Sequence, residues 1–154
     1  MEAPIIAGVA HDRSEAKVTV VGVPDRTGMA APIFEAVTLA QINIDMIVQN
    51  VSATATGLTD ISFTLPKTDG TAAVEALRRV QADVGFTAVQ FDDQIGKLSL
   101  VGAGMRSNPG VSATFFKALA NAGVNIEMIS TSEIRISVIT RDDLLDQAVR
   151  AVHT

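Results

Sequence analysis

The chain nearly repeats itself, and this internal repeat constrains its fold more than any other feature. Val18–Gly22 (VTVVG) resembles Leu98–Gly102 (LSLVG), and Asn43–Ile47 (NIDMI) resembles Asn125–Ile129 (NIEMI). A repeat that spans about half of the chain is too long for a solenoid. It predicts two copies of one small α/β module, and such a pair is more often a binding device than a catalyst.

The spacing within the repeat is also kept. Gly28 lies as far before Asn43 as Gly110 lies before Asn125, and Asn108–Pro109 is a short insertion in the second copy. Residues between these landmarks therefore correspond one to one in the two copies.

Composition excludes several classes of function. The chain has 154 residues, of which 47% are hydrophobic and only 4% aromatic, so each core must be built from aliphatic side chains. A net charge of −5 argues against a nucleic-acid partner, which usually meets a basic face. There is no cysteine, and the two histidines, His11 and His153, lie near opposite ends, so a thiol, histidine or metal centre is not expected.

No feature of the sequence points to a membrane or to export. No apolar run reaches the roughly 18 residues of a membrane span, and the first ten residues lack the basic start of a signal peptide. The expected location is the cytoplasm, without a cofactor.

The first copy is predicted to be a βαββαβ module. A β-rich run ends at a loop that begins with Pro24, and a helix follows in which Ile33, Phe34 and Val37 share one face. This order suits an α+β, ferredoxin-like sheet with both helices on one face. The expected elements are strands 17–23, 44–51, 58–65 and 86–91 and helices 29–41 and 71–81.

The second copy repeats this order but lacks its closing strand. Its expected elements are strands 98–103, 125–130 and 134–140, a helix 111–121 that Gly123 stops, and a last helix that opens at 141–143. A spare strand is available in Ile5–Ala10. We therefore expect a first domain over 17–92 and a second over 93–154 that the N-terminal segment 1–16 completes.

The loop 24–30 is the first candidate binding site. It joins a strand to a helix start, where unpaired N–H groups and the positive end of the helix dipole suit a carboxylate. Asp25 adds an acceptor for an ammonium group, so the loop offers both groups that a free α-amino acid needs. The plainer interpretation is that Asp25 and Gly28 only form a turn and cap the helix.

Other polar positions have two interpretations. Asn43 and Asn125 are each typical of turn residues with a positive φ, although their occurrence in one repeated motif favours a shared function. Gln49–Asn50 and Thr131–Glu133 follow matching strands and would face either solvent or a cleft. Gly102–Gly104 resembles part of a dinucleotide motif but lacks its third glycine.

At this point the chain resembles a known family. Val23–Gly28 (VPDRTG), Ile42–Ile47 (INIDMI) and Thr59–Thr64 (TDISFT) look like an ACT domain. The pair Lys97–Met105 and Val124–Ser137 is more specific and is similar to the tandem-ACT regulatory region of bacterial aspartate kinase. The resemblance covers essentially the whole chain, and the kinase's catalytic domain has no counterpart in it.

The resemblance implies a regulatory rather than a catalytic role. The chain looks like the separate beta subunit of the alpha2beta2 class, and that family is feedback-inhibited by lysine and threonine. The same is then expected here, with a homodimer in isolation and the catalytic alpha subunit as the partner.

The resemblance also implies the site residues. In the family, threonine binds between the first ACT module of one chain and the second of its partner. Carried onto this sequence, the two walls are Asp25, Gly28, Ala30 and Gln49, and Asn125 and Ile126. The corresponding region for a second effector, lysine, comprises Met105, Ser112, Ser132 and Glu133.

Two other functions remain open. One is a generic ACT-type amino-acid sensor that serves a different enzyme, and titration with several amino acids would separate it from the first. The other is a small enzyme on a ferredoxin-like fold, since fold does not fix function.

Overall fold

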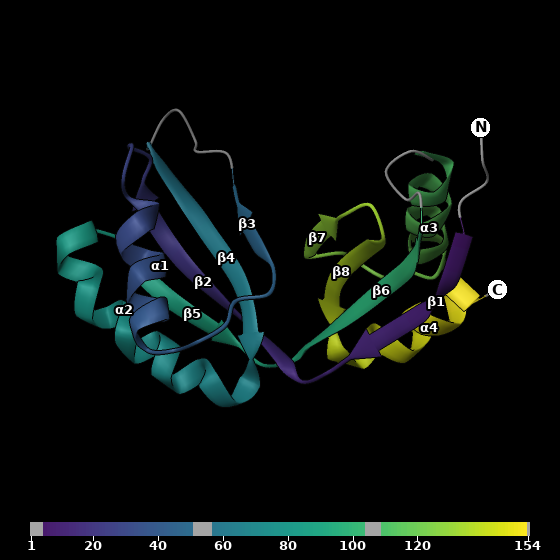
Figure 1. The fold of residues 1–154 in the computed structure, drawn as a ribbon, viewed down its shortest axis with the longest axis horizontal. Coiled ribbons are helices and arrows are strands. Elements are labelled where there is room, and N and C mark those ends of the chain that lie inside the picture. Colours follow the sequence, from purple (N-terminus) through teal and green to yellow (C-terminus); the bar gives the residue numbers. More distant parts are fainter. Residues whose placement is uncertain (1–4, 51–56, 104–108, 154) are drawn as a thin grey trace. The chain divides into compact units, whose positions relative to one another are not determined.

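The computed structural model describes residues 5–50, 57–103 and 109–153. The chain forms two compact units, and one of them is discontinuous (Figure 1). The continuous unit covers residues 15–93, and the other combines residues 1–14 with 94–154. The expected boundaries, 17–92 and 93–154 with 1–16, lie within two residues of these.

The continuous unit has the element order βαββαβ. Its antiparallel sheet has the strand order β3-β4-β2-β5, and α1 and α2 lie on one face of the sheet (Figure 1). A short 3₁₀ helix, Lys67–Asp69, precedes α2. The elements are β2 (Glu15–Pro24), α1 (Ala30–Leu39), β3 (Ile47–Gln49), β4 (Leu58–Pro66), α2 (Gly70–Val84) and β5 (Ala88–Asp92).

The discontinuous unit repeats this arrangement with one substitution of strands. Its antiparallel sheet has the order β1-β6-β8-β7, so the N-terminal strand β1 stands where β5 stands in the other unit. A 3₁₀ helix, Asp142–Leu144, again precedes the last helix. The elements are β1 (Ile5–Asp12), β6 (Ile95–Ala103), α3 (Pro109–Asn121), β7 (Met128–Thr131), β8 (Arg135–Arg141) and α4 (Leu145–His153).

Each unit has its own core between sheet and helices, and both cores are mostly aliphatic but include buried phenylalanines, Phe63 and Phe86 in one and Phe115 in the other, whereas composition led us to expect aliphatic side chains alone. Alternate strand residues face the helices, as expected for a sheet covered on one side. In the continuous unit these side chains meet Ile33 and Val37 of α1, and in the other unit they meet Phe115 and Leu119 of α3. The buried strand residues are Val18, Val20, Ile61, Phe63 and Leu65 in the first core and Leu98, Leu100, Ile136 and Val138 in the second.

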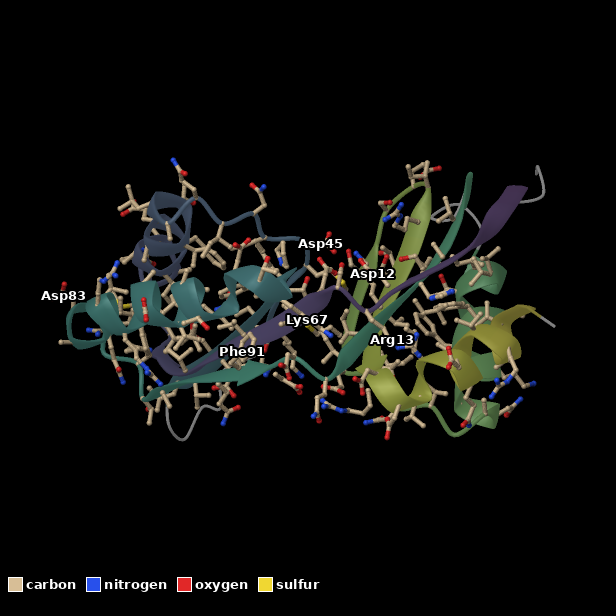
Figure 2. All side chains as sticks on the ribbon, turned by 90° about the horizontal axis from the view of Figure 1, so that it is seen from below. Asp12, Arg13, Asp45, Lys67, Asp83 and Phe91 are labelled. Carbon is tan, nitrogen blue, oxygen red and sulfur yellow. The ribbon has the colours of Figure 1, made fainter. Side chains whose placement is uncertain are left out.

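In each unit a glycine lets the second helix approach a strand of the sheet closely, although the two contacts lie on strands that do not correspond. Gly70 begins α2, and a Cβ there would overlap the ring of Phe91 on β5; Phe91 is labelled in Figure 2. In the other unit Leu145 begins α4, and a Cβ on Gly96 of β6 would lie 2.8 Å from the Leu145 side chain. Each contact pairs one large residue with a glycine, so helix and strand approach closely in both units.

Two expected strands are shorter in the structure. We predicted strand 44–51, but β3 begins only at Ile47. Before it the pairing with β4 is irregular, because Thr64 takes both Asp45 and Met46 as partners: its carbonyl accepts from the N–H of Asp45 (2.9 Å), its N–H donates to the carbonyl of Met46 (2.9 Å), and its hydroxyl accepts from the N–H of Met46 (2.9 Å). The predicted strand 125–130 likewise begins at Met128. Val51, the expected end of the first strand, lies outside the described residues.

Helices α1 and α3 end in the same hydrogen-bonded turn, which corrects one sequence prediction. The N–H of Ile42 binds the carbonyl of Val37, as the N–H of Val124 binds that of Leu119. The left-handed residue of this motif is Gln41 (φ +60°) in the first copy and glycine in the second (φ +74°). The positive φ predicted for Asn43 and Asn125 is therefore wrong, and it falls two residues earlier in each copy.

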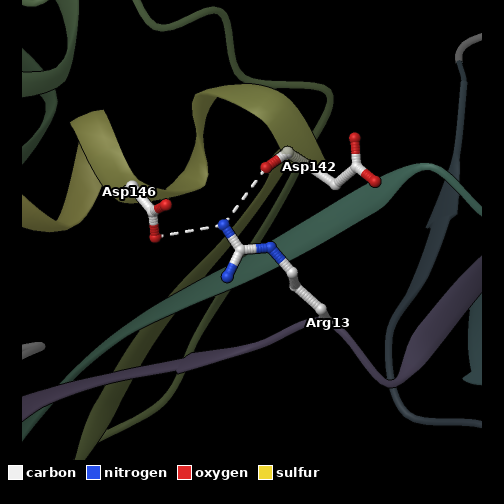
Figure 3. A network of polar contacts seen from close by, with 3 residues as sticks. All are labelled: Arg13, Asp142 and Asp146. Carbon is white, nitrogen blue, oxygen red and sulfur yellow. Dashed lines mark hydrogen bonds and ion pairs between the residues drawn. The ribbon is translucent and has the colours of Figure 1, made fainter.

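The N-terminal strand is also tied to the start of α4. Arg13, directly after β1, donates to the backbone carbonyl of Asp142 (3.4 Å) and to the carboxylate of Asp146 (3.1 Å), as Figure 3 shows. The hydrogen bond from Arg13, reinforced by its charge, lowers the pKa of the Asp146 carboxyl below the ordinary value. Both side chains are exposed, so the ion pair contributes little to stability. The backbone hydrogen bonds between β1 and β6 remain the main contact that holds β1 in place.

The strained turn predicts a stabilising substitution. Gln41→Gly should raise the free energy of unfolding by about 0.5–1 kcal/mol, because glycine adopts a positive φ without the penalty of a Cβ. Gly123→Ala should lower it by about 1 kcal/mol, although nothing lies within 4 Å of the added Cβ. Chemical denaturation measures both, and a Gln41→Gly protein that is less stable than the parent would contradict the assignment.

The Arg13 contact predicts a pH effect with a definite sign. A lowered pKa means that folding favours the charged Asp146, so the contact stabilises the fold above the ordinary carboxyl pKa and is lost as the pH falls through the lowered value. Arg13→Gln should raise the pKa of Asp146 in a carbon NMR titration. Arg150→Gln, which removes a weaker influence, should raise it less, and equal shifts in the two variants would refute the contact.

Candidate functional site

The loop between β2 and α1 is an ordered turn with exposed polar side chains. Three backbone bonds hold it: Asp25 N–H to the carbonyl of Gly57 (2.9 Å), Arg26 N–H to that of Pro24 (3.0 Å), and Met29 N–H to that of Arg26 (3.3 Å). The side chain of Asp25 is exposed. The backbone of Asp25 is thus fixed while its carboxylate stays open to a ligand.

Gly28 shapes the loop directly before helix α1. Its φ is +89°, and nothing lies within 4 Å of the position that a Cβ would take. A side chain there would be strained by the backbone conformation and would fill open space in front of the loop. The absence of a side chain at Gly28 therefore both permits the turn and leaves the space beside it open.

Helix α1 begins without a side-chain cap. Its N-cap, Met29, has no capping hydrogen bond, and no acidic residue stands in the first turn. The first N–H groups of a helix have no partner within it, and the dipole places partial positive charge there. Ala30 is the first helical residue, so its N–H belongs to this set, whereas Pro32 contributes none.

A bulge in β2 directs the strand into this loop. The register against β4 shifts between Val20 and Val23, and Gly22 has φ +72°. Its N–H donates to the carboxylate of Asp60 on β4 (3.0 Å), and a Cβ at Gly22 would overlap the Thr87 side chain. The bulge is therefore closed by specific contacts on both sides.

Gln49 lies on β3, the edge strand of the same sheet. Its register partner on β4 is Ile61, and its side chain is exposed. The structure therefore brings Asp25 and Gly28 together in one loop, with Ala30 next to it as the first residue of α1. It places Gln49 in the same unit but on a separate strand.

The other two residues of the expected threonine site lie in the discontinuous unit, between α3 and β7. Asn125 has an exposed side chain, and its backbone carbonyl accepts a hydrogen bond from the Thr140 hydroxyl (3.0 Å). The side chain of Ile126 packs against the core of that unit. Asn125 thus presents a side-chain amide, while Ile126 has a core role and leaves only its backbone for a ligand.

The residues expected around a second effector are spread over several elements. Ser112 is half-buried in the first part of α3, and Glu133 is exposed between β7 and β8. Ser132 forms a turn, with its N–H and hydroxyl both donating to the carbonyl of Arg135 (2.7 and 3.4 Å). Met105 lies outside the described residues.

The sequence missed Gly57, directly before β4, which holds the loop, and Asp60 on β4, which holds the bulge before it. Both contacts depend on the register of β4 against β2, and no local pattern shows that register. The two matched hydroxyl pairs, Thr19–Ser62 (2.9 Å) and Ser99–Ser137 (2.7 Å), were missed for the same reason.

No group of three or more histidine, cysteine, aspartate or glutamate side chains lies close enough to hold a metal ion within residues 5–50, 57–103 and 109–153. Over the same ranges, no helix is long and apolar enough to cross a membrane.

Comparison with known proteins agrees with the repeat. A family model for the ACT domain matches twice, over residues 18–81 and 98–154. An aspartokinase of Mycobacterium tuberculosis is 61% identical over 153 residues, which are 99% of this chain but 36% of that protein. The chain therefore spans little more than a third of the length of the curated relatives it matches.

Solved structures match along nearly the whole chain. The ligand-free regulatory subunit of aspartate kinase from Thermus thermophilus has a TM-score of 0.90 and 41% identity, covering 96% of this chain and 97% of that one. A structure of aspartokinase alpha and beta subunits has a TM-score of 0.88 and 43% identity, covering 96% of each chain.

Proposed function

Because this chain belongs to the ACT-domain family and matches aspartate kinase regulatory subunits over nearly its whole length, we propose that it is a non-catalytic regulatory subunit of that enzyme. In this proposal it binds threonine and, together with the alpha subunit, lysine. Binding then inhibits the kinase that starts the synthesis of these amino acids. The site carries no chemistry of its own, and catalysis resides in the alpha subunit.

The single observation that carries the amino-acid site is the geometry of the β2–α1 loop. An α-amino acid has an ammonium and a carboxylate on one carbon. The exposed Asp25 carboxylate suits the ammonium group, and the uncapped start of α1 at Ala30 suits the carboxylate. Gly28 lies in the same loop, and no atom lies within 4 Å of the position that a Cβ there would take. The alternative interpretation, in which Asp25 and Gly28 only form a turn and cap the helix, has less support because no side chain caps α1.

The second wall of the threonine site comes from the partner chain in this proposal. Asn125 has its backbone carbonyl engaged with Thr140 and its side-chain amide exposed, so the amide is available to a ligand. Ile126 contributes backbone only, since its side chain packs in the core. Gln49 completes the first wall. For the second effector we propose Ser112, Ser132 and Glu133, with Met105.

The proposed assemblies are a homodimer in isolation and an alpha2beta2 holoenzyme, and the proposed location is the cytoplasm. Edge strands β3 and β7 carry large exposed aliphatic residues at matching positions, Ile47 (54% exposed) and Ile129 (47%). An unpaired sheet edge with apolar side chains is a template for another strand. Side-by-side pairing of the sheets would cover both.

The proposal predicts that Asp25 is needed for threonine binding. Asp25→Ala should weaken binding at least about tenfold, because a charge-assisted hydrogen bond contributes about 1.5–3 kcal/mol. Isothermal titration calorimetry with threonine measures the change. Titrations of the parent with lysine, methionine and isoleucine test which amino acid the site prefers.

Glu75→Ala is the matched control, since it removes an exposed carboxylate from α2 of the same unit. It should bind threonine like the parent. If Asp25→Ala also binds like the parent, Asp25 does not hold the ammonium group. If another amino acid binds and threonine does not, the chain is a sensor of a different kind.

A further inference from the structure

A buried hydroxyl binds the backbone next to the second wall of the proposed site. Thr140 lies on β8, and its side chain is fully buried. Its hydroxyl donates to the backbone carbonyl of Asn125 (3.0 Å), in the segment between α3 and β7. A buried hydroxyl without a partner destabilises a core, so this bond is needed to keep a polar side chain at the position.

The first copy of the repeat has no equivalent of this bond. The registers of β3 on β4 and of β7 on β8 place Leu65 at the position of Thr140. Leu65 is equally buried, but its side chain has no hydrogen-bonding group. The hydroxyl of the first copy belongs to the preceding residue, Thr64, and accepts from the N–H of Met46 (2.9 Å). A hydroxyl therefore holds the asparagine of the repeated motif only in the second copy.

The bond sets the direction of the peptide group between Asn125 and Ile126. No peptide bond among the described residues is cis, and in a trans peptide the carbonyl and the N–H point in opposite directions. Because Thr140 holds the carbonyl of Asn125 toward β8, the N–H of Ile126 points away from β8. This N–H has no hydrogen-bond partner in the part of the chain that the structure describes.

Backbone bonds fix the segment on both sides of this peptide. The N–H of Val124 donates to the carbonyl of Leu119 (3.0 Å), and the N–H of Glu127 donates to the carbonyl of Ile139 (2.8 Å). The peptide that joins residues 125 and 126 lies between these two points. Its orientation is therefore held by the Thr140 hydroxyl rather than by a backbone partner.

We propose that Thr140 is a positioning residue for the threonine site, because its hydroxyl turns the N–H of Ile126 and the side chain of Asn125 toward the ligand. This inference rests on the proposed function, which places both residues on the second wall. There, Asp25 and the start of α1 take the ammonium and carboxylate groups. The hydroxyl of the ligand is then the polar group left for the second wall, where an N–H can donate to it and an amide can donate or accept.

Removal of the hydroxyl tests this role. Thr140→Val keeps the shape of the side chain, and its threonine dissociation constant should rise about three- to tenfold, the range for one lost hydrogen bond. Thr140→Ser keeps the hydroxyl and should bind threonine like the parent. Isothermal titration calorimetry gives the constants, and thermal unfolding confirms that each variant is folded.

Ser137→Ala is the matched control, since it removes another buried hydroxyl from the same strand. Ser137 pairs with Ser99 (2.7 Å) and not with the segment before β7. The variant should lose thermal stability but bind threonine like the parent. A second measurement needs no variant: in an NMR titration of the parent, saturating threonine should move the amide proton of Ile126 downfield. The same shift should be smaller in Thr140→Val.

The proposal is overturned if Thr140→Val binds threonine like the parent or if Ser137→Ala weakens binding equally. It is also overturned if the Ile126 amide of the parent does not respond to threonine. Asn125→Ala separates these failures from that of the proposed function. If Asn125→Ala weakens binding and Thr140→Val does not, only the role of Thr140 is wrong, whereas a parent that does not bind threonine contradicts the proposed function itself.

Discussion

The antiparallel pairing of β1 with β6 is the constraint on which the rest of this structure depends. The second copy of the repeat has no closing strand after α4 within the described residues, and β1 supplies one from the other end of the chain. The complete first module is thereby inserted into the second. The chain passes between the two units twice, at 14–15 and at 93–94.

The residues next to both connections, at 14–15 and 93–94, are held by hydrogen bonds to the segment that begins at Asp142 in the discontinuous unit. Arg13 binds the start of α4 through Asp142 and Asp146, and the N–H of Asp142 donates to the carbonyl of Gln94 (3.0 Å). The packing of Leu145 on Gly96 lies two residues beyond the second passage. The ends of both connections are therefore set by the fold of this unit.

The arrangement of elements could be predicted from the sequence because it depends on local patterns and on duplication. Apolar spacing indicated the helices, β-rich runs indicated the strands, and the repeat allowed each copy to support the other. The left-handed turn could also have been found this way. Gly123 marks it in the second copy, and the alignment transfers it to Gln41 rather than to Asn43.

Features that depend on strand register could not be predicted. The sequence identified the loop that contains Asp25 and Gly28, but not the bond from Asp25 to Gly57 or the bulge closed by Asp60. It also did not show that Ile126 packs in a core, because an apolar residue after Asn125 fits a binding wall and a core equally well. Burial and long-range pairing decide such cases.

The central claim is that a threonine site is shared between two copies of this chain. A ligand that binds only where two chains meet must strengthen their association, and association must strengthen its binding equally. The direct measurement is the dimer dissociation constant from sedimentation velocity, with and without saturating threonine. The account predicts a lower constant with threonine, and a loss of this effect in Asn125→Ala. An unchanged constant in the parent protein would place the site within one chain and contradict the account.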